Sequence, residues 1–220
     1  NWNPGSNLSA RPEYTERSIA MLAARAKRAM FEYLPIRSHP DEAERVYRAY
    51  RYGPVAEVFV LDQRSYRAAN GPNREEAAGP ATRMMGAAQV AWLKQSLAAA
   101  RATWKIIASD MPLGLLIGDG QVNGVPAWEA WANGTGGPLG REFEIADVLS
   151  FIKRERVRNV VWVTADVHYA AAHYYDPKVA VFKDFTPFWE FVGGPLHAGT
   201  FGPNTTDPTF GCTQVFNSLP

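Results

Sequence analysis

The chain of 220 residues carries 23 basic and 22 acidic side chains, which leaves a formal net charge of +1. This balance excludes a surface of one dominant sign, so we expect no nucleic acid as a structural partner and no anionic membrane surface. The single cysteine, Cys212, excludes an internal disulfide, and no apolar run approaches the roughly 18 residues of a membrane-spanning helix. A hydrophobic fraction of 46% suits one globular domain, which we expect to occupy residues 1–220.

The first predicted element is a helix near the N-terminus. Residues 1–14 are rich in Asn, Pro, Gly and Ser and predict a loop. Residues 14–34 then show an apolar stripe at helical spacing, with Thr15 and Ser18 as N-cap candidates and Pro35 at the end. We expect this helix to turn its basic residues toward solvent.

Strand and helix patterns then alternate along the chain. Short apolar runs predict strands, and apolar residues that repeat at intervals of three and four predict helices. In chain order they give a strand at 55–62, a helix at 86–100, a strand at 104–110, a helix at 141–156 and a strand at 159–166. This order predicts an α/β fold with at least partly parallel strands.

Two regions show a less regular pattern. Residues 112–140 are rich in Gly, Pro, Asn and Trp and are too long for a simple connection, which favours a functional loop. With Trp128, Glu129 and Trp131, this segment either walls a cleft or only packs on the surface. Residues 169–220 predict short strands and turns.

Each of the three predicted strands ends in an aspartate: Asp62, Asp110 and Asp166. The strands are continuously apolar, which is typical of strands buried on both faces. In an open α/β sheet, ligands bind beyond the carboxyl ends of the strands. Three carboxylates gathered there would repel one another unless a cation lay between them. We therefore favour a metal or phosphate site, although each Asp taken alone also suits a turn or helix cap.

The ending Asp166-Val167-His168 adds an imidazole to the carboxylate. Residues two apart on an extended segment face the same way, so Asp166 and His168 would point together while Val167 returns to the core. A carboxylate beside an imidazole suits a divalent or trivalent metal ion.

Other polar residues allow both a functional and a structural interpretation. Arg64 and Arg67 follow the first strand and suit either phosphate binding or a surface salt bridge. His197 lies among glycines that would let the backbone approach a ligand, and a turn histidine is the alternative. We interpret His173 as a packed or hydrogen-bonded residue and Cys212 as structural.

Longer segments match a known family in its order and together span nearly the whole chain: "NWNPG", "VFVLDQRSYR", "MMGAAQVAWLKQSLAAARATWKIIASDMPLG", "GPLGREFEIADVLSFIKRERVRNVVWVTADVHYAAAHYYDP", "FWEFVGGPLHAGTFGP" and "DPTFG". In these segments the chain resembles the alkaline phosphatase D family, within the calcineurin-like metallophosphoesterase superfamily. The resemblance implies part of a two-layer β-sandwich flanked by helices, with a polynuclear metal centre at the strand ends.

The resemblance also implies which residues bind metal. Ala165-Asp166-Val167-His168 aligns with the superfamily's last ligand motif, so Asp166 would bind one metal and His168 the other. Asp110 takes the position of the penultimate ligand, where the superfamily has histidine, and is the third predicted ligand. Iron with calcium is the implied pair of metals, and an oxygen-rich ligand set suits calcium.

The resemblance further implies that the chain is the C-terminal part of a catalytic domain. The family's first ligand motifs and its catalytic histidine lie before the motif that contains Asn1 and Trp2, so no catalytic residue is assigned within this chain. Export to the periplasm or out of the cell is also implied, through a signal that would precede Asn1.

These inferences predict metal-dependent hydrolysis of phosphate monoesters or diesters, in which a metal-activated water attacks phosphorus. Arg64 and His197 would bind the substrate phosphate. One alternative is an inactive fragment that only binds metal or a partner. A second alternative is a hydrolase with a Ser–His–Asp relay, but the chain has no Gly-x-Ser-x-Gly elbow.

Overall fold

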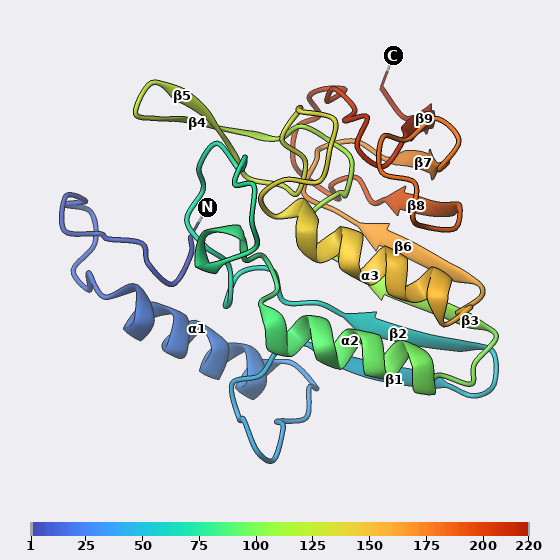
Figure 1. Cartoon of the computed structure of the whole chain (residues 1–220). Coiled ribbons are helices and arrows are strands. Elements are labelled where there is room, and N and C mark those ends of the chain that lie inside the picture. Colours follow the sequence, from blue (N-terminus) through green and yellow to red (C-terminus); the bar gives the residue numbers. More distant parts are fainter. Residues whose placement is uncertain (1, 220) are drawn as a thin grey trace.

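A computed structural model describes residues 2–219, so Asn1, which the sequence places in a family motif with Trp2, and Pro220 lie outside the described residues. Figure 1 shows a twisted sheet with helices packed along it. The elements are α1 (Ile19–Tyr33), β1 (Arg48–Tyr52), β2 (Ala56–Val60), the 3₁₀ turn η1 (Pro80–Thr82), α2 (Ala87–Ala99), β3 (Trp104–Ala108), β4 (Gly118–Val122), β5 (Val125–Trp128), α3 (Glu142–Arg154), β6 (Val160–Thr164), β7 (Ala171–Tyr175), β8 (Phe188–Val192) and β9 (Cys212–Asn217).

The main sheet has seven strands in the order β1-β2-β3-β6-β8-β7-β9, and β4 and β5 form a separate hairpin. Strands β2, β3, β6 and β8 are parallel neighbours, whereas β1, β7 and β9 are antiparallel to theirs. The α/β class with partly parallel pairing is therefore confirmed. Because β2, β3 and β6 run the same way side by side, their carboxyl ends meet at one edge of the sheet.

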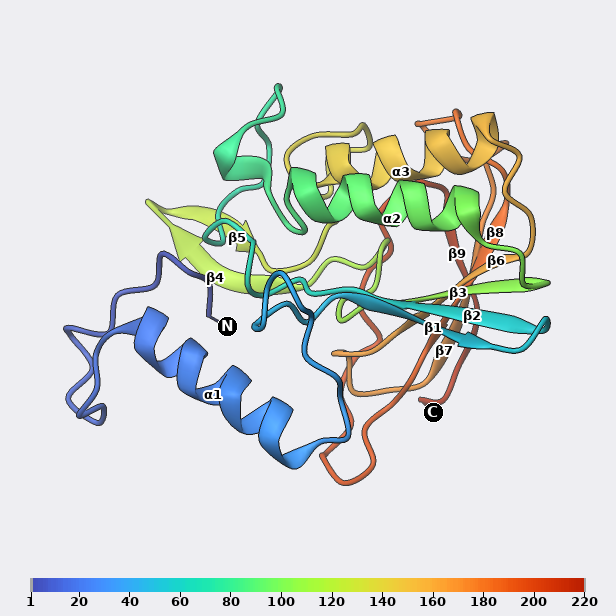
Figure 2. The ribbon, with the colours of Figure 1, turned by 90° about the horizontal axis from the view of Figure 1, so that it is seen from below.

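Helices α2 and α3 lie side by side on one face of the sheet (Figure 2). Each connects two adjacent parallel strands, and right-handed crossovers in one direction place successive helices on the same face. The predicted face of α3 is buried: Ile145, Val148, Leu149 and Ile152 are at most 5% exposed. Full burial of such a side chain stabilises the fold by roughly 1.5–3 kcal/mol. This packing makes the sheet a rigid base for its loops.

The other face of the sheet is only partly covered by the described residues. Val161 pairs with Trp189 and Val163 with Phe191 on this face. Val163, Trp189 and Phe191 are 41%, 38% and 46% exposed. The prediction that these strands are buried on both faces is therefore wrong for β6 within residues 2–219. The continuous apolar pattern is present, but no layer of the described part covers this side.

Helix α1 lies away from the two core helices (Figure 2). Ser18 caps it as predicted, since its side chain accepts a hydrogen bond from the main-chain N–H of Met21 at 3.2 Å. The helix contains no buried residue, so its apolar stripe does not enter the core. Among residues 2–219, no helix combines the length and apolar character needed to cross a membrane.

Two elements differ from the sequence-based expectation. Strand β1 was not predicted, because four of its five residues are arginine or tyrosine and four of the five are exposed at the sheet edge. Residues 112–140 contain the β4–β5 hairpin rather than only loop, with Asn123 and Gly124 both at positive φ in the turn. An Asn-Gly pair is a strong hairpin signal, and it was overlooked.

Candidate functional site

The three strand-end aspartates lie at one edge of the sheet, because β2, β3 and β6 are parallel neighbours. Each follows its strand by two residues, and they differ in exposure. Asp62 is 5% exposed, Asp110 is half-buried and Asp166 is exposed. The register argument from the sequence therefore placed the three residues at the correct edge.

Asp62 serves the local fold. Its Oδ1 accepts hydrogen bonds from the main-chain N–H groups of Arg64 at 3.0 Å and Ser65 at 2.8 Å. Its own main-chain N–H and C=O both bond to the side chain of Gln89 on α2. The turn-cap interpretation is thus the correct one for this aspartate. The turn that it caps directs Arg64 toward the site.

Asp166 lies where the chain leaves β6. The strand ends at Thr164, and Asp166 has a φ of +73°. The prediction of an extended Asp166–His168 segment is therefore wrong at Asp166, although Val167 does return to the core at 3% exposure. A positive φ is uncommon outside glycine, and such residues concentrate at functional sites. The backbone therefore bends at Asp166 and no longer follows the extended path of β6.

His168 is oriented by a main-chain contact. Its Nδ1 lies 2.6 Å from the carbonyl oxygen of Gly199, and its ring centre lies 4.4 Å from that of Phe201. A carbonyl can only accept, so Nδ1 carries the proton and donates it. The lone pair of Nε2 is then free for another partner. Metal-binding histidines are commonly oriented in this way.

Charges around the aspartates have opposite signs. Burial raises the pKa of Asp110 and Asp62 raises it further, while Arg64 acts in the opposite direction. Burial and Glu129 raise the pKa of Asp166, while Arg64 and His168 lower it. The acidic group that raises the pKa of Asp110 is therefore Asp62, whereas the one that raises the pKa of Asp166 is Glu129. The expected repulsion between carboxylates exists, but it acts within two pairs, Asp110 with Asp62 and Asp166 with Glu129, and not among all three aspartates.

The donor set suits a metal ion in part. Asp166 offers an exposed carboxylate, and His168 offers an imidazole nitrogen whose tautomer is fixed. Oxygen and imidazole donors fit iron, and oxygen donors fit calcium. Within residues 2–219, however, no three His, Cys, Asp or Glu side chains form a group that could hold a metal ion. The described residues fit part of a metal site, and a complete one needs further ligands.

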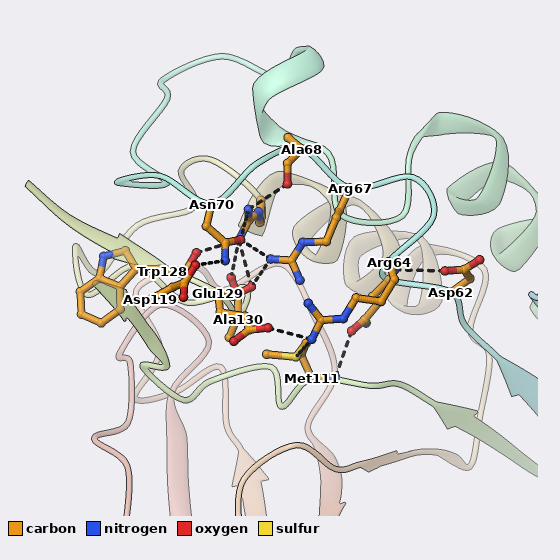
Figure 3. A network of polar contacts seen from close by, with 12 residues as sticks. Asp62, Arg64, Arg67, Ala68, Asn70, Met111, Asp119, Trp128, Glu129 and Ala130 are labelled. Carbon is orange, nitrogen blue, oxygen red and sulfur yellow. Dashed lines mark hydrogen bonds and ion pairs between the residues drawn. The ribbon is translucent and has the colours of Figure 1, made fainter. Parts of the chain in front are cut away.

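Arg64 and Arg67 both reach from the loop after β2 toward Glu129 (Figure 3). Arg64 Nη2 donates to Glu129 Oε1 at 2.7 Å, and Arg67 Nη2 donates to the main-chain oxygen of Glu129 at 2.6 Å. Arg67 is 3% exposed, and burial, followed by the charges of Arg141 and Arg64, lowers its pKa to about 9. It stays cationic at neutral pH. Neither arginine therefore forms the surface salt bridge that was the structural alternative.

Arg141, which the sequence analysis did not single out, is the buried centre of this network. Its guanidinium donates to five main-chain oxygens and one side chain, those of Ala68, Ala69, Trp128, Glu129 and Ala130, and Asn70 Oδ1. Burial lowers its pKa to about 10. Arg141 stands at the N-cap of α3, where a cation opposes the helix dipole, and that misplaced charge was the available signal.

The remaining residues singled out in the sequence, His197, His173 and Cys212, differ in their exposure and surroundings. His197 is exposed in the loop that also supplies the Gly199 carbonyl to His168. His173 is fully buried, with Nδ1 2.8 Å from Glu190 Oε2. The prediction of a packed, hydrogen-bonded His173 is confirmed. Cys212 packs against the core, and burial raises the pKa of its thiol, which fits a structural role.

Comparison with known proteins identifies relatives of the whole chain. Residues 1–217 match the family model described as "PhoD-like phosphatase". The chain is 29% identical over 214 residues to alkaline phosphatase D of Bacillus subtilis (strain 168), covering 92% of this chain and 35% of that protein. A solved structure described as "Structure of PhoD" superposes with a TM-score of 0.58 at 25% identity, covering 88% of this chain and 37% of the other.

The chain thus spans a little over a third of the length of these relatives. The match to the family model nevertheless extends over almost every residue, including the strand-end aspartates, His168 and the arginine loop. The chain belongs to the PhoD-like phosphatase family.

Proposed function

We propose that the protein hydrolyses phosphate monoesters or diesters with the help of bound metal ions, and that this chain carries one side of the site. The family supports phosphoric ester hydrolysis as the reaction. The observation that carries the proposal is His168, whose Nδ1–H is committed to the Gly199 carbonyl beside the exposed Asp166. That arrangement leaves a carboxylate and an imidazole nitrogen available at the carboxyl edge of the sheet.

Asp166, His168 and Asp110 would hold the metals, which we propose to be iron with calcium. Bound metal ions polarise phosphoryl oxygens and lower the pKa of a coordinated water, which supplies the nucleophile. Asp110 is half-buried next to Asp62, and a cation would relieve the repulsion that raises its pKa. His168 is held in one tautomer, so it needs no rearrangement before binding.

Arg64 and His197 would bind the substrate phosphate. The charge of Arg64 lowers the pKa of both Asp110 and Asp166. A guanidinium in that place would stabilise the charge that builds on the non-bridging oxygens. His197 is exposed in the neighbouring loop and free to approach a phosphate from solvent. We assign no general acid or base within this chain.

A second candidate is a chain that binds metal or a partner without turnover. It is favoured because no group of three His, Cys, Asp or Glu side chains among residues 2–219 is placed to hold a metal ion. We also propose that the substrate is a small phosphate ester and that the protein is exported to the periplasm or out of the cell. Both points follow from the family resemblance.

Metal content and hydrolysis together test the proposal. Protein purified without chelator or affinity metal is measured by inductively coupled plasma mass spectrometry, and is then assayed with p-nitrophenyl phosphate and bis(p-nitrophenyl) phosphate. We expect bound iron or calcium and hydrolysis that a chelator abolishes. Metal without hydrolysis would favour the second candidate. Hydrolysis that resists the chelator would contradict the metal mechanism and support a serine relay.

A further inference from the structure

The ion pair between Arg64 and Glu129 differs from an ordinary surface pair. The atoms Arg64 Nη2 and Glu129 Oε1 lie 2.7 Å apart, and the two side chains are only 24% and 7% exposed. The same Nη2 also lies 3.7 Å from the sulfur of Met111. Arg64 is thus held on one side by a largely desolvated carboxylate. A pair in this environment fixes geometry far better than an exposed pair does.

The main chain of Glu129 is fixed on both sides. Its N–H donates to the carbonyl of Ile117 at 2.8 Å. Its carbonyl oxygen accepts from Arg67 Nη2 at 2.6 Å and from Arg141 Nη1 at 2.9 Å. Figure 3 shows Arg64 and Arg67 both reaching Glu129. The carboxylate of Glu129 is therefore attached to a backbone that has little freedom to move.

Arg141 joins the two loops that meet at this ion pair. It bonds to the main chain at residues 68–69, in the loop that carries Arg64 and Arg67, and to residues 128–130, which carry Glu129. The loop that carries Arg64 and the segment that carries Glu129 are consequently tied together. The hydrogen bonds of Arg141 thus hold Arg64 and Glu129 close to each other, although neither of these two side chains takes part in them.

The pair also lies close to the strand-end carboxylates. The charge of Arg64 influences both Asp110 and Asp166, and the charge of Glu129 influences Asp166. An anion bound by Arg64 at this edge would therefore also experience the negative charge of Glu129.

We infer that Glu129 is a positioning residue that orients Arg64 toward the phosphate group of the substrate and limits how tightly that group is held. This inference rests on the proposed function. Two effects follow from one carboxylate. Its hydrogen bond restricts rotation of the Arg64 guanidinium, and its negative charge opposes the anion. Removing the charge should therefore tighten anion binding while it impairs turnover, and a purely structural residue would not produce that split.

Two variants separate orientation from charge. Glu129→Gln keeps the length of the side chain and removes its charge, whereas Glu129→Asp keeps the charge and shortens the reach. Glu57→Gln, at the start of β2 and thus at the far end of that strand, is the matched control for loss of one negative charge. The measurements are binding of inorganic phosphate by calorimetry, nitrogen-15 NMR of the Arg64 guanidinium, and hydrolysis of p-nitrophenyl phosphate. Thermal unfolding verifies that each variant is folded.

In the parent protein we expect separate NMR signals from the two restricted Nη groups of Arg64. In Glu129→Gln these signals should merge, and phosphate should bind about fivefold more tightly, the effect of one charge acting over about 4 Å in water. Turnover should fall roughly tenfold because orientation is lost. In Glu129→Asp the signals should also merge and turnover should fall, while phosphate affinity should stay within about twofold. Glu57→Gln should match the parent.

Unchanged Arg64 signals in both variants would overturn the inference, as would unchanged phosphate affinity in Glu129→Gln. Failure of the proposed function has a different signature: the parent would neither bind phosphate nor hydrolyse the ester, although its Arg64 signals remained separate. That result would remove the phosphate role of the pair together with the proposed function.

Discussion

The two sides of the candidate site are built in different ways. On the metal side, Asp166 is exposed at a bent backbone position and His168 is oriented by one carbonyl. On the proposed phosphate side, which is the Arg64 loop with Glu129, Arg64 pairs with the buried Glu129. Arg141 donates hydrogen bonds to the main-chain carbonyls around this pair. One side consists of a few separate ligands, and the other is a connected hydrogen-bonded network.

This difference teaches which properties belong to the chain itself. A network of buried hydrogen bonds is preorganised, so the placement of Arg64 should not depend on metal. On the proposed metal side, no three possible ligands among residues 2–219 are gathered into one group, so this side should be weaker and more sensitive to single changes. Four predictions test that contrast, in order of decreasing effect.

Replacing Arg141 should damage the phosphate side most. The change Arg141→Met removes the Arg141 bond from six acceptors, of which the Glu129 carbonyl and Asn70 Oδ1 keep a bond from Arg67, so we expect the free energy of unfolding to fall by about 4 kcal/mol in a urea titration. The exposed Arg158→Met is the control and should change it by less than about 0.5 kcal/mol. A loss below about 1 kcal/mol at Arg141 would mean that water replaces the network easily.

Replacing Asp166 should damage only the metal side. We expect Asp166→Ala to lower metal affinity at least about 100-fold, measured as bound metal per chain during titration, because a ligand is removed. Stability should change little, since the carboxylate is exposed. Asp184→Ala, which removes a surface partner of Lys153, should leave metal binding unchanged. Equal metal binding by Asp166→Ala and the parent would refute this ligand assignment.

Glu142 belongs to neither side of the site, but it should make the stability of the chain depend on pH. This dependence must be known before the effect of pH on the site can be interpreted. Burial, and then the charge of Asp207, raises the pKa of Glu142 from 4.5 to about 8. The folded chain therefore keeps a proton that the unfolded chain releases, so this contribution to stability is present below about pH 4.5 and is lost as pH rises to about 8.

We expect the unfolding free energy of the parent to fall by about 2–4 kcal/mol across that window, and Glu142→Gln to abolish most of this slope. Glu155→Gln, an exposed change at the other end of α3, should keep the slope. Urea titrations at several pH values measure it. A parent whose stability rises through the window would show the opposite sign and contradict the assignment.

The smallest effect should lie in α1. Ser18→Ala removes the N-cap bond to Met21, which costs about 1 kcal/mol of local helix stability. Hydrogen exchange of the first α1 amides should become about fivefold faster. Binding of metal and of phosphate should not change, because α1 buries no residue. A change in either would indicate that α1 contacts the site.

Much of the fold was predictable, because burial leaves a periodic trace. The face of α3, the parallel strands and their aspartate ends all follow from local apolar spacing. The trace fails at β1, whose residues are mostly exposed, and at the β4–β5 hairpin, where only the turn at Asn123 and Gly124 signals the structure. It also overstated burial, since Val163 belongs to the continuous apolar run of β6 but is 41% exposed.

The site was predictable only where strand ends meet. The register of the parallel strands placed Asp110 and Asp166 at one edge, whereas the extended spacing assumed for Asp166 and His168 is broken by the positive φ of Asp166. The roles of Glu129 and Arg141 did not follow, because they depend on which loops meet in space. Arg141 bonds mainly to main-chain carbonyls, and every residue has one. The sequence therefore gives no sign of which residues are its partners.

The position of Arg141 has a consequence for the order of folding. Its bond to Asn70 spans 71 residues, a longer loop than the 48 residues between the paired Ala56 and Trp104 or the 55 between Lys105 and Val160 in the parallel strands. Contacts that close such long loops form after the entropy of closure has been overcome by other packing. The core of α2, α3 and the parallel strands should therefore be able to assemble before the loops around Arg64 are locked. Local opening should release those loops first, so phosphate affinity would report the last step of folding, which measurements of helix content cannot detect.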